Sequence, residues 1–199
     1  MSQLKLGITG GIASGKSVAS HFFRTCGVPV YDCDSRARIL MESDPKLQAD
    51  LQELLGPAFF DGQGALDRPR LAAALFGDQE LLEQVNGLVH PRVKDDFVCW
   101  AARHNTAPVV AMESAILFES GFGSAVDKVL LVTSPREVRI ARAMQRDGAT
   151  RGEVEQRMAR QMDDAEKMNR SHFVVINDGF TPLLPQLVDV IASLKLIIF

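Results

Sequence analysis

The sequence is poor in the features on which several protein classes depend. Its three cysteines, Cys26, Cys33 and Cys99, are an odd number without a Cys-x-x-Cys pair, which excludes a full disulfide framework and fits a reducing compartment. No run of about 18 apolar residues is present, so we expect no transmembrane helix. The first ten residues lack the charged start and the small-residue cleavage site of a signal peptide. We therefore expect a cytoplasmic protein with no membrane partner.

An excess of positive charge is missing as well. The chain carries 22 Lys and Arg against 25 Asp and Glu, a net charge of -3, which argues against broad nucleic-acid binding. Its hydrophobic fraction of 46% and charged fraction of 24% are those of an ordinary globular protein. A length of 199 residues suffices for one compact domain with a small insertion. The oligomeric state is left open.

Four or five short apolar runs stand out between longer helical stretches. They are near-continuous rather than alternating, which is typical of parallel strands covered on both faces. Helical patterns separate them in a βαβ rhythm. We therefore predict an α/β fold with a parallel sheet of about five strands and helices on both faces. The runs are Leu4–Thr9, Val28–Tyr31, Val109–Met112, Val129–Val132 and Phe173–Ile176.

The interval from about 36 to 107 interrupts this rhythm. It is too long for a loop, and its leucines recur at helical spacing between turn signals such as Gly56-Pro57. We interpret it as a helical subdomain inserted between strands, so that residues 1–35 and 108–199 form the core. A second stretch, roughly 142–170, is polar, rich in arginine and free of strand patterns.

The strongest chemical signal follows the first apolar run. It matches the phosphate-loop pattern G-x-x-x-x-G-K-[ST], with a strand before it and a helical stretch from Val18 to Arg24 after it. Glycines let backbone N–H groups turn around phosphate oxygens, Lys16 supplies charge for the β- and γ-phosphates, and the Ser17 hydroxyl can ligate Mg²⁺. The predicted nucleotide-binding residues are Gly10, Gly11, Ile12, Ala13, Ser14, Gly15, Lys16, Ser17 and Val18.

The motifs of other nucleotide-binding classes are missing. A dinucleotide fold needs G-x-G-x-x-G, and a guanine-nucleotide switch needs Asn-Lys-x-Asp and Asp-x-x-Gly. A motor or transporter ATPase is normally larger. A compact kinase whose helical inserts close over two substrates is the interpretation that remains. A nucleotide-binding regulatory protein without turnover is the alternative from another class.

Phosphoryl transfer also needs a group that orients the acceptor hydroxyl and cations on the γ-phosphate. Asp32 and Asp34 follow the second run, at the carboxyl edge of the sheet where sites of this fold lie. We favour Asp32 as the catalytic base, with loop capping as the alternative for both. Arg139, Arg142 and Arg146 share one helix face. For most arginines of residues 136–170 we expect a solvated, salt-bridged helix pair. The alternative makes Arg142 and Arg146 lid cations that reach the phosphates on closure.

In their order along the chain, these residues resemble the dephospho-coenzyme A kinases. The phosphate loop alone predicts only a bound nucleoside triphosphate, whereas the ordered set covers nearly the whole chain. The stretches that resemble the family are Leu6–Ser17, Val30–Asp34, Leu66–Arg68, His90-Pro91, Leu117–Glu119, Arg142–Asp147, Arg157–Gln161 and Asn177–Gly179.

The resemblance implies transfer of the γ-phosphate of ATP, with Mg²⁺, to the ribose 3′-hydroxyl of dephospho-CoA. It implies that Asp32 is the base with Lys16 and Arg142 on the phosphates, that 36–107 binds the acceptor and that about 142–165 is a lid. Asn177 and Gly179 are then expected near the adenine, together with Arg146 on the nucleotide. Without the resemblance, a nucleoside, nucleotide or sugar-acid kinase with the same core remains possible.

The chain departs from the family pattern at a few positions. Glu113-Ser114-Ala115-Ile116 stands where the family has Asp-x-Pro-Leu, and Glu113 can still hold a metal-bound water with a reach longer by one methylene. Val18 replaces a common threonine. His90, in a His-Pro pair that ends an insert helix in the family, either contacts substrate or redirects the chain. We expect Asp34, His90 and Glu113 on the substrate side of the site.

Overall fold

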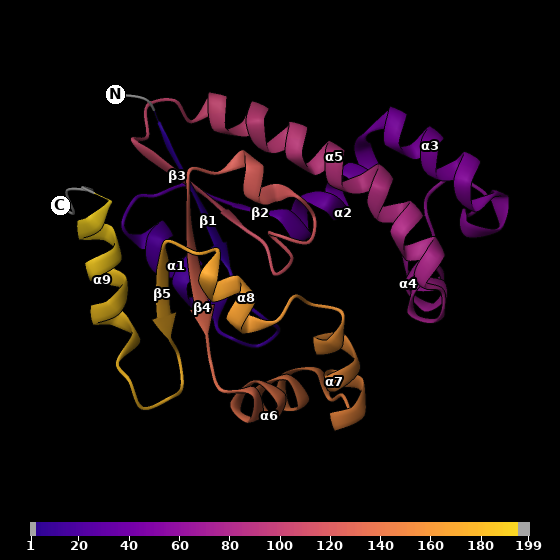
Figure 1. Cartoon of the computed structure of the whole chain (residues 1–199). Coiled ribbons are helices and arrows are strands. Elements are labelled where there is room, and N and C mark those ends of the chain that lie inside the picture. The colour runs from indigo at the N-terminus through magenta and orange to yellow at the C-terminus, as the bar shows by residue number, and fades with distance from the viewer. Residues whose placement is uncertain (1–2, 195–199) are drawn as a thin grey trace. The chain divides into compact units, whose positions relative to one another are not determined.

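A five-stranded parallel sheet organises the fold in the computed structural model of the chain, which describes residues 3–194 (Figure 1). The spatial order is β2-β3-β1-β4-β5, and all four strand pairs are parallel. The predicted α/β class and strand number are confirmed. The strands are β1 (Leu4–Thr9), β2 (Val30–Asp32), β3 (Val109–Glu113), β4 (Lys128–Thr133) and β5 (Phe173–Ile176).

The second strand differs from its prediction at both ends. It begins at Val30 rather than at Val28, because the Val28 N–H donates a hydrogen bond to the Phe23 carbonyl near the end of the preceding helix. It also extends to Asp32, which pairs in register with Glu113 of β3. Asp32 is therefore fixed as the last residue of a strand instead of belonging to the loop that follows.

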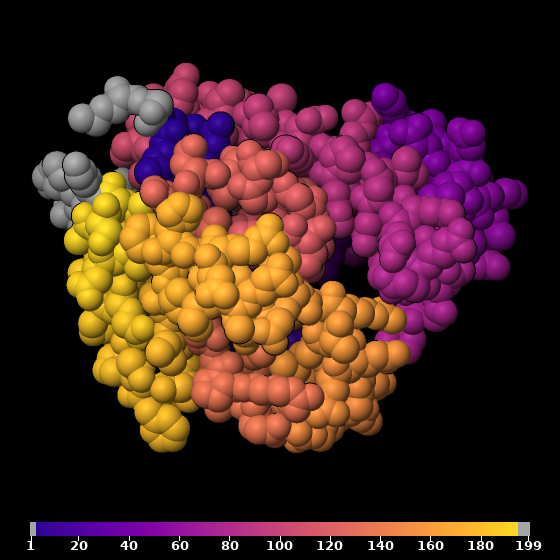
Figure 2. Space-filling view, in the orientation of Figure 1, coloured from indigo at the N-terminus to yellow at the C-terminus, as the bar shows by residue number. Residues whose placement is uncertain are grey.

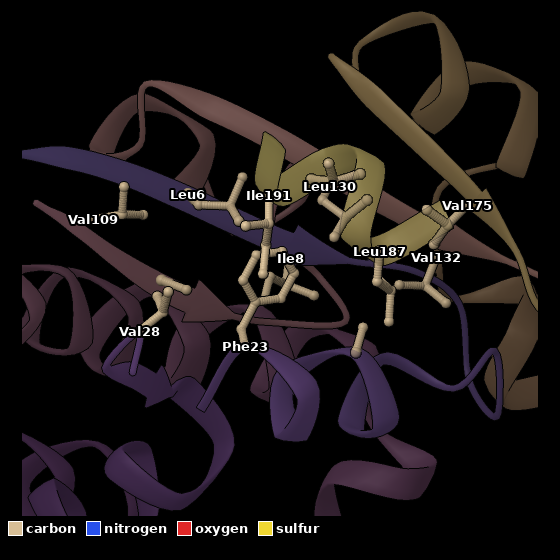
Figure 3. Close-up of a cluster of buried hydrophobic side chains, with 13 residues drawn as sticks. Leu6, Ile8, Phe23, Val28, Val109, Leu130, Val132, Val175, Leu187 and Ile191 are labelled. Atoms are coloured by element: carbon tan, nitrogen blue, oxygen red, sulfur yellow. The ribbon is translucent and has the colours of Figure 1, made fainter. Parts of the chain in front are cut away.

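Helices α1 (Lys16–Thr25) and α9 (Leu183–Ser193) cover one face of the sheet. The side chains labelled in Figure 3 point toward one another between these helices and the strands. Burying each large apolar side chain stabilises the fold by roughly 1.5–3 kcal/mol. The cluster contains Leu6, Ile8, Ala19, Phe23, Val28, Val109, Ala111, Leu130, Val132, Val175, Leu187, Val190 and Ile191.

The opposite face is covered by the segment after β3 and by α8 (Asp164–Asn169), which packs on β4. This segment contains the short helix η2 (Phe122–Ala125). A Cβ atom at Gly7 in β1 would lie 2.7 Å from Leu117 Cδ2, so this face of the strand needs glycine for close packing. In the space-filling view, orange to yellow residues of the C-terminal part of the chain form a continuous stretch of the surface that faces the viewer (Figure 2).

Two helices between β4 and α8 form the arginine-rich segment, α6 (Arg136–Asp147) and α7 (Arg151–Ala159). Gly148 ends α6 with a left-handed φ of 64°, and Thr150 begins α7 with a capping box to Glu153. Pro135 precedes the first helical residue of α6, and the buried Ser134 hydroxyl before it accepts a 3.4 Å hydrogen bond from Arg142.

The chain divides into two compact units, with boundaries after Asp32 and after Cys99. These boundaries differ from the sequence-based limits of 36 and 107, because α2 begins at Cys33 and α5 runs through the second boundary. Asp44 and Asp67 cap helices in the second unit through their side chains. Its helices are α2 (Cys33–Ser43), α3 (Pro45–Leu55), η1 (Pro57–Phe59), α4 (Arg68–Gly77) and α5 (Gln79–Arg103).

The pair His90-Pro91 does not end a helix, contrary to the expectation from the family. It lies in the middle of the 25-residue helix α5. Proline removes one helical hydrogen bond and crowds the carbonyl four residues earlier. That residue is Gly87, where an added Cβ atom would meet no side chain or neighbouring element within 4 Å among the described residues. Within residues 3–194, no helix is both long and apolar enough to span a bilayer.

Candidate active site

The phosphate loop joins β1 to α1 in a shape that only glycine permits at two positions. Gly15 has a left-handed φ of 100°, and Gly10 has a φ of 153°. A Cβ atom at Gly10 would collide with the Val132 carbonyl, and one at Gly15 would collide with the Asn177 side-chain amide. The loop is thus held against the ends of β4 and β5, and its last turn opens α1 with the positive end of the helix dipole at the loop.

The two reactive side chains of the motif lie at the start of α1. The Lys16 ammonium donates to the Gly11 carbonyl at 3.4 Å, and the Ser17 hydroxyl donates to Glu113 Oε1, also at 3.4 Å. Glu113 is the last residue of β3, and it pairs in register with Ile8 of β1. The structure therefore brings Glu113 to the serine that is predicted to ligate the metal.

Asp32 and Glu113 end two adjacent strands. Their registered pairing places them on neighbouring strands of the sheet, which are separated by about 4.8 Å. Both lie at the carboxyl edge, where the phosphate loop follows β1. Two carboxylates, one ammonium and a row of loop amides thus meet at one edge, and this combination suits an anionic nucleotide, a divalent cation and a hydroxyl to be deprotonated.

The loop after β5 is fastened to the phosphate loop by Asn177. Its side-chain amide donates to the Ser14 carbonyl at 2.9 Å, and its own carbonyl accepts from Arg142 Nη1 at 2.9 Å. Gly179 follows with a left-handed φ of 92°. Asp178 accepts the N–H groups of the next turn, and these backbone hydrogen bonds lower the pKa of its carboxyl. The predicted adenine-side residues therefore lie together with Arg142.

Arg146 lies further along α6 and makes a two-pronged hydrogen bond to Asp147, at 2.7 and 3.1 Å. This contact lowers the pKa of the Asp147 carboxyl, with a smaller effect from Arg157. The Arg146 side chain is 61% exposed, so its interaction with Asp147 is screened by water and worth little to stability. Of the two predicted lid cations, Arg142 contacts the loop after β5 and Arg146 lies at the surface.

Arg139 and Gln161 contact the phosphate loop, although sequence reasoning did not assign them to the site. Gln161 Oε1 accepts the Ile12 N–H at 2.9 Å. The Arg139 side chain is only 9% exposed, pairs with Asp164 at 2.8 Å and occupies the space beside Gly11 that a Cβ atom would need. The arginine stripe of the sequence already contained Arg139, but periodicity does not show which member of a stripe points inward.

Asp34 and His90 belong to the second compact unit, residues Cys33–Cys99. Asp34 lies in the first turn of α2, where a carboxylate interacts favourably with the helix dipole. His90 is half-buried in α5, and burial lowers its imidazole pKa from the ordinary value of 6.5. It is therefore mostly neutral at pH 7.

The donors at the strand ends suit magnesium. Among residues 3–194, no group of three or more His, Cys, Asp and Glu side chains is arranged to hold a metal ion. Ser17 and Glu113 are hard oxygen donors of the kind that Mg²⁺ prefers, and this ion commonly takes its remaining ligands from substrate phosphates and water. The residues present therefore fit a metal that enters with the nucleotide.

Known proteins with related sequences match this chain over nearly its whole length. The family model described as dephospho-CoA kinase matches residues 4–182. A dephospho-CoA kinase of Bacteroides fragilis (strain YCH46) is 45% identical over 191 residues, which cover 96% of this chain and 93% of the relative.

Solved structures agree with the fold. A crystal structure of a Thermus thermophilus protein aligns with a TM-score of 0.82 and 34% identity, over 98% of this chain and 97% of that one. The dephospho-CoA kinase of Campylobacter jejuni aligns with a TM-score of 0.68 over 95% and 96% of the two chains. Its identity of 21% supports the shared fold alone.

Proposed function

The chain belongs to the dephospho-CoA kinase family, and on that premise we propose how its own residues carry out the reaction. It is an ATP-dependent kinase of dephospho-CoA. The observation that carries the residue assignment is the pairing of Asp32 with Glu113 at the ends of adjacent strands, with Glu113 in contact with Ser17 of the phosphate loop.

The phosphate loop binds the triphosphate of ATP. Its backbone N–H groups and the start of α1 face the negative charge, and Lys16 interacts with the β- and γ-phosphates, where charge develops during transfer. In the structure, the Lys16 ammonium donates to the Gly11 carbonyl. Binding replaces this neutral acceptor with an anionic one, which forms a stronger, charge-assisted contact.

Ser17 and Glu113 would hold magnesium on the phosphate side of the site. When bound, Mg²⁺ neutralises negative charge on the phosphate oxygens. Glu113 is one methylene longer than the aspartate of the family pattern, and its 3.4 Å contact with Ser17 indicates that it still reaches the serine. We propose that Glu113 holds the hydroxyl of Ser17 and would add an oxygen donor on the metal side of the site.

Asp32 orients the 3′-hydroxyl of the ribose and accepts its proton as the oxygen attacks the γ-phosphorus. Its place at the end of a strand fixes the carboxylate more firmly than a loop would. Arg142 and Asn177 keep the adenine-side loop in place through their 2.9 Å contacts. Gly179 lets that loop turn beside the base.

The unit from Cys33 to Cys99 supplies the acceptor site, with Asp34 and His90 as candidate contacts to dephospho-CoA, and the segment 142–165 serves as the lid. Arg146 in that segment contributes to nucleotide binding on closure. The cytoplasmic location and the lack of a nucleic-acid partner stay predictions from composition.

The function is tested by coupled measurement of ADP release with MgATP and four acceptors, dephospho-CoA, adenosine, AMP and gluconate. We expect release with dephospho-CoA alone, and CoA as the product identified by mass spectrometry. Release with adenosine would show that a free ribose suffices. Release with none of the four would contradict the proposed activity.

The role of Asp32 is tested by Asp32→Asn. The amide keeps the shape of the side chain but cannot accept the proton, so we expect kcat to fall by about 10²- to 10⁴-fold with ATP binding little changed. Asp189→Asn on the exposed face of α9 is the matched control and should retain full turnover. Near-normal kcat in Asp32→Asn would remove Asp32 from the mechanism.

A further inference from the structure

One peptide group of the phosphate loop is held from both sides. The Gly11 carbonyl accepts the Ser14 N–H at 3.2 Å and the Lys16 ammonium at 3.4 Å. The N–H of the same peptide, carried by Ile12, donates to Gln161 Oε1 at 2.9 Å. The orientation of this peptide therefore sets one contact of the Lys16 ammonium, and a side chain 149 residues away holds the N–H side of the peptide.

Gln161 is itself held in place. It follows the last turn of α7, where its own N–H donates to the Met158 carbonyl at 3.0 Å. Gln161 Oε1 lies 3.4 Å from the position of a Cβ atom at Gly11, and the guanidinium of Arg139 is nearer still. Asp164 at the start of α8 pairs with Arg139 at 2.8 Å. The segment between α7 and α8 thus closes on the outer side of the loop.

A glycine beside a peptide lowers the resistance of that peptide to rotation, because glycine accepts backbone conformations that other residues do not. Without an acceptor for its N–H, the Gly11–Ile12 peptide loses one of the hydrogen bonds that hold it. The observed orientation is the one that directs the carbonyl toward Lys16. Ala13, which has a left-handed φ of 56°, shows that the loop already holds an unfavourable conformation at the next position but one.

We propose that Gln161 is a positioning residue for the phosphate loop, holding the Gly11–Ile12 peptide in the orientation that prepares Lys16 for the triphosphate. The proposal rests on the proposed function of the loop. Gln161 acts through the peptide and not on the substrate. Because it lies in the segment assigned as the lid, it also links that segment to nucleotide affinity.

The test compares Gln161→Met, which keeps length but removes the acceptor, with Gln156→Met on the exposed face of α7. The dissociation constant for MgADP is measured by calorimetry without acceptor, and KM for ATP, KM for dephospho-CoA and kcat are measured by ADP release. We expect Gln161→Met to weaken MgADP binding and to raise KM for ATP about 10-fold, the scale of an amide left without its partner. KM for dephospho-CoA and kcat should stay within about 2-fold, and Gln156→Met should match the wild type.

Each outcome is decisive. Unchanged MgADP binding in Gln161→Met overturns the proposal, even if the melting temperature falls, because a merely structural role would lower stability alone. Tighter binding also overturns it, since Gln161 would then compete with the nucleotide for the Ile12 N–H. A wild-type enzyme that releases no ADP with dephospho-CoA refutes the proposed function instead, and the calorimetric comparison still tests Gln161.

Discussion

A fully buried lysine offers a quantitative test of how the site is supported. Lys167 in α8 is 0% exposed, and its ammonium lies 3.0 Å from Glu119 Oε1 and 3.0 Å from the Ala115 carbonyl. The Glu119 side chain is 21% exposed and also accepts the Met162 N–H at 2.8 Å. The pair fastens α8 to the segment that directly follows Glu113, the last residue of β3. We therefore expect it to stabilise the position of this strand end.

Removing either partner leaves a different group behind. Removing one member of a buried ion pair typically costs 3–5 kcal/mol, because the other charge stays uncompensated. In Lys167→Met the remaining carboxylate keeps some water and one N–H partner, so we expect about 3 kcal/mol. In Glu119→Gln the remaining ammonium keeps the neutral Ala115 carbonyl but has no access to water, so we expect about 5 kcal/mol. The double variant leaves no charge and should be more stable than Glu119→Gln alone.

The free energies of unfolding are measured by urea denaturation, with the slope compared between variants to check that the same surface unfolds. We expect Glu119→Gln to lose more free energy of unfolding than Lys167→Met. The loss in the double variant should be well below the sum of the two single losses. A larger loss in Lys167→Met than in Glu119→Gln would refute the reasoning from exposure. Additive losses in the double variant would show that the two side chains do not interact.

Two further perturbations follow from the structure. Burial lowers the pKa of His90, so the unfolded chain binds more protons at acid pH, and stability should fall as the pH drops below about 6.5. Urea midpoints at pH 7.5 and 5.5 should show a smaller difference in His90→Gln than in the wild type, whereas the exposed His21→Gln should keep it, and equal differences would refute the assignment. Gly11→Ala should weaken MgADP binding at least about 10-fold because its Cβ displaces the Arg139 guanidinium. Part of this loss should be recovered in a Gly11→Ala/Arg139→Ala double variant, and a strictly additive result would show that the two positions do not contact each other.

The sheet and the phosphate loop could be predicted because their signals are local. Near-continuous apolar runs mark strands that are buried on both faces, and the loop motif lies between its strand and its helix as the chemistry requires. The strand ends then place Asp32 and Glu113 at one edge without any knowledge of side-chain contacts. The misplaced start of β2 has a local cause too, since Val28 still completes the turn after α1.

Helix interruptions were harder to predict, as Pro91 shows. A proline in a helical pattern normally indicates an end, and the family pattern suggested the same. Whether the helix continues depends on the room around the residue four positions earlier. Gly87 carries no side chain and has open space at its Cβ position, and nothing in a periodic pattern distinguishes this glycine from one that breaks a helix.

The arginine-rich segment shows where pattern reasoning stops. Its interpretation as a solvated, salt-bridged helix pair is right for Arg136 and Arg151, which pair with Glu137 and Glu155 at the surface. It is wrong for Arg139, whose side chain is 9% exposed and pairs with Asp164. The sequence does not distinguish an exposed arginine from a buried one. Whether a buried arginine is tolerated depends on a partner from another part of the fold.

The side chains that support the site therefore come from the part of the sequence that looks most like surface. Arg139 and Gln161 close on the outer side of the phosphate loop, and Lys167 fastens the segment that follows β3. Strand ends fix the backbone positions of the carboxylates, but a glycine-rich loop lacks the ladder of hydrogen bonds that fixes a strand. Its peptides need partners from elsewhere, and here these partners lie in and beside the segment assigned as the lid. A change of that segment's position on closure would consequently alter the loop that binds ATP, which makes nucleotide affinity in Gln161→Met the most direct measure of this coupling.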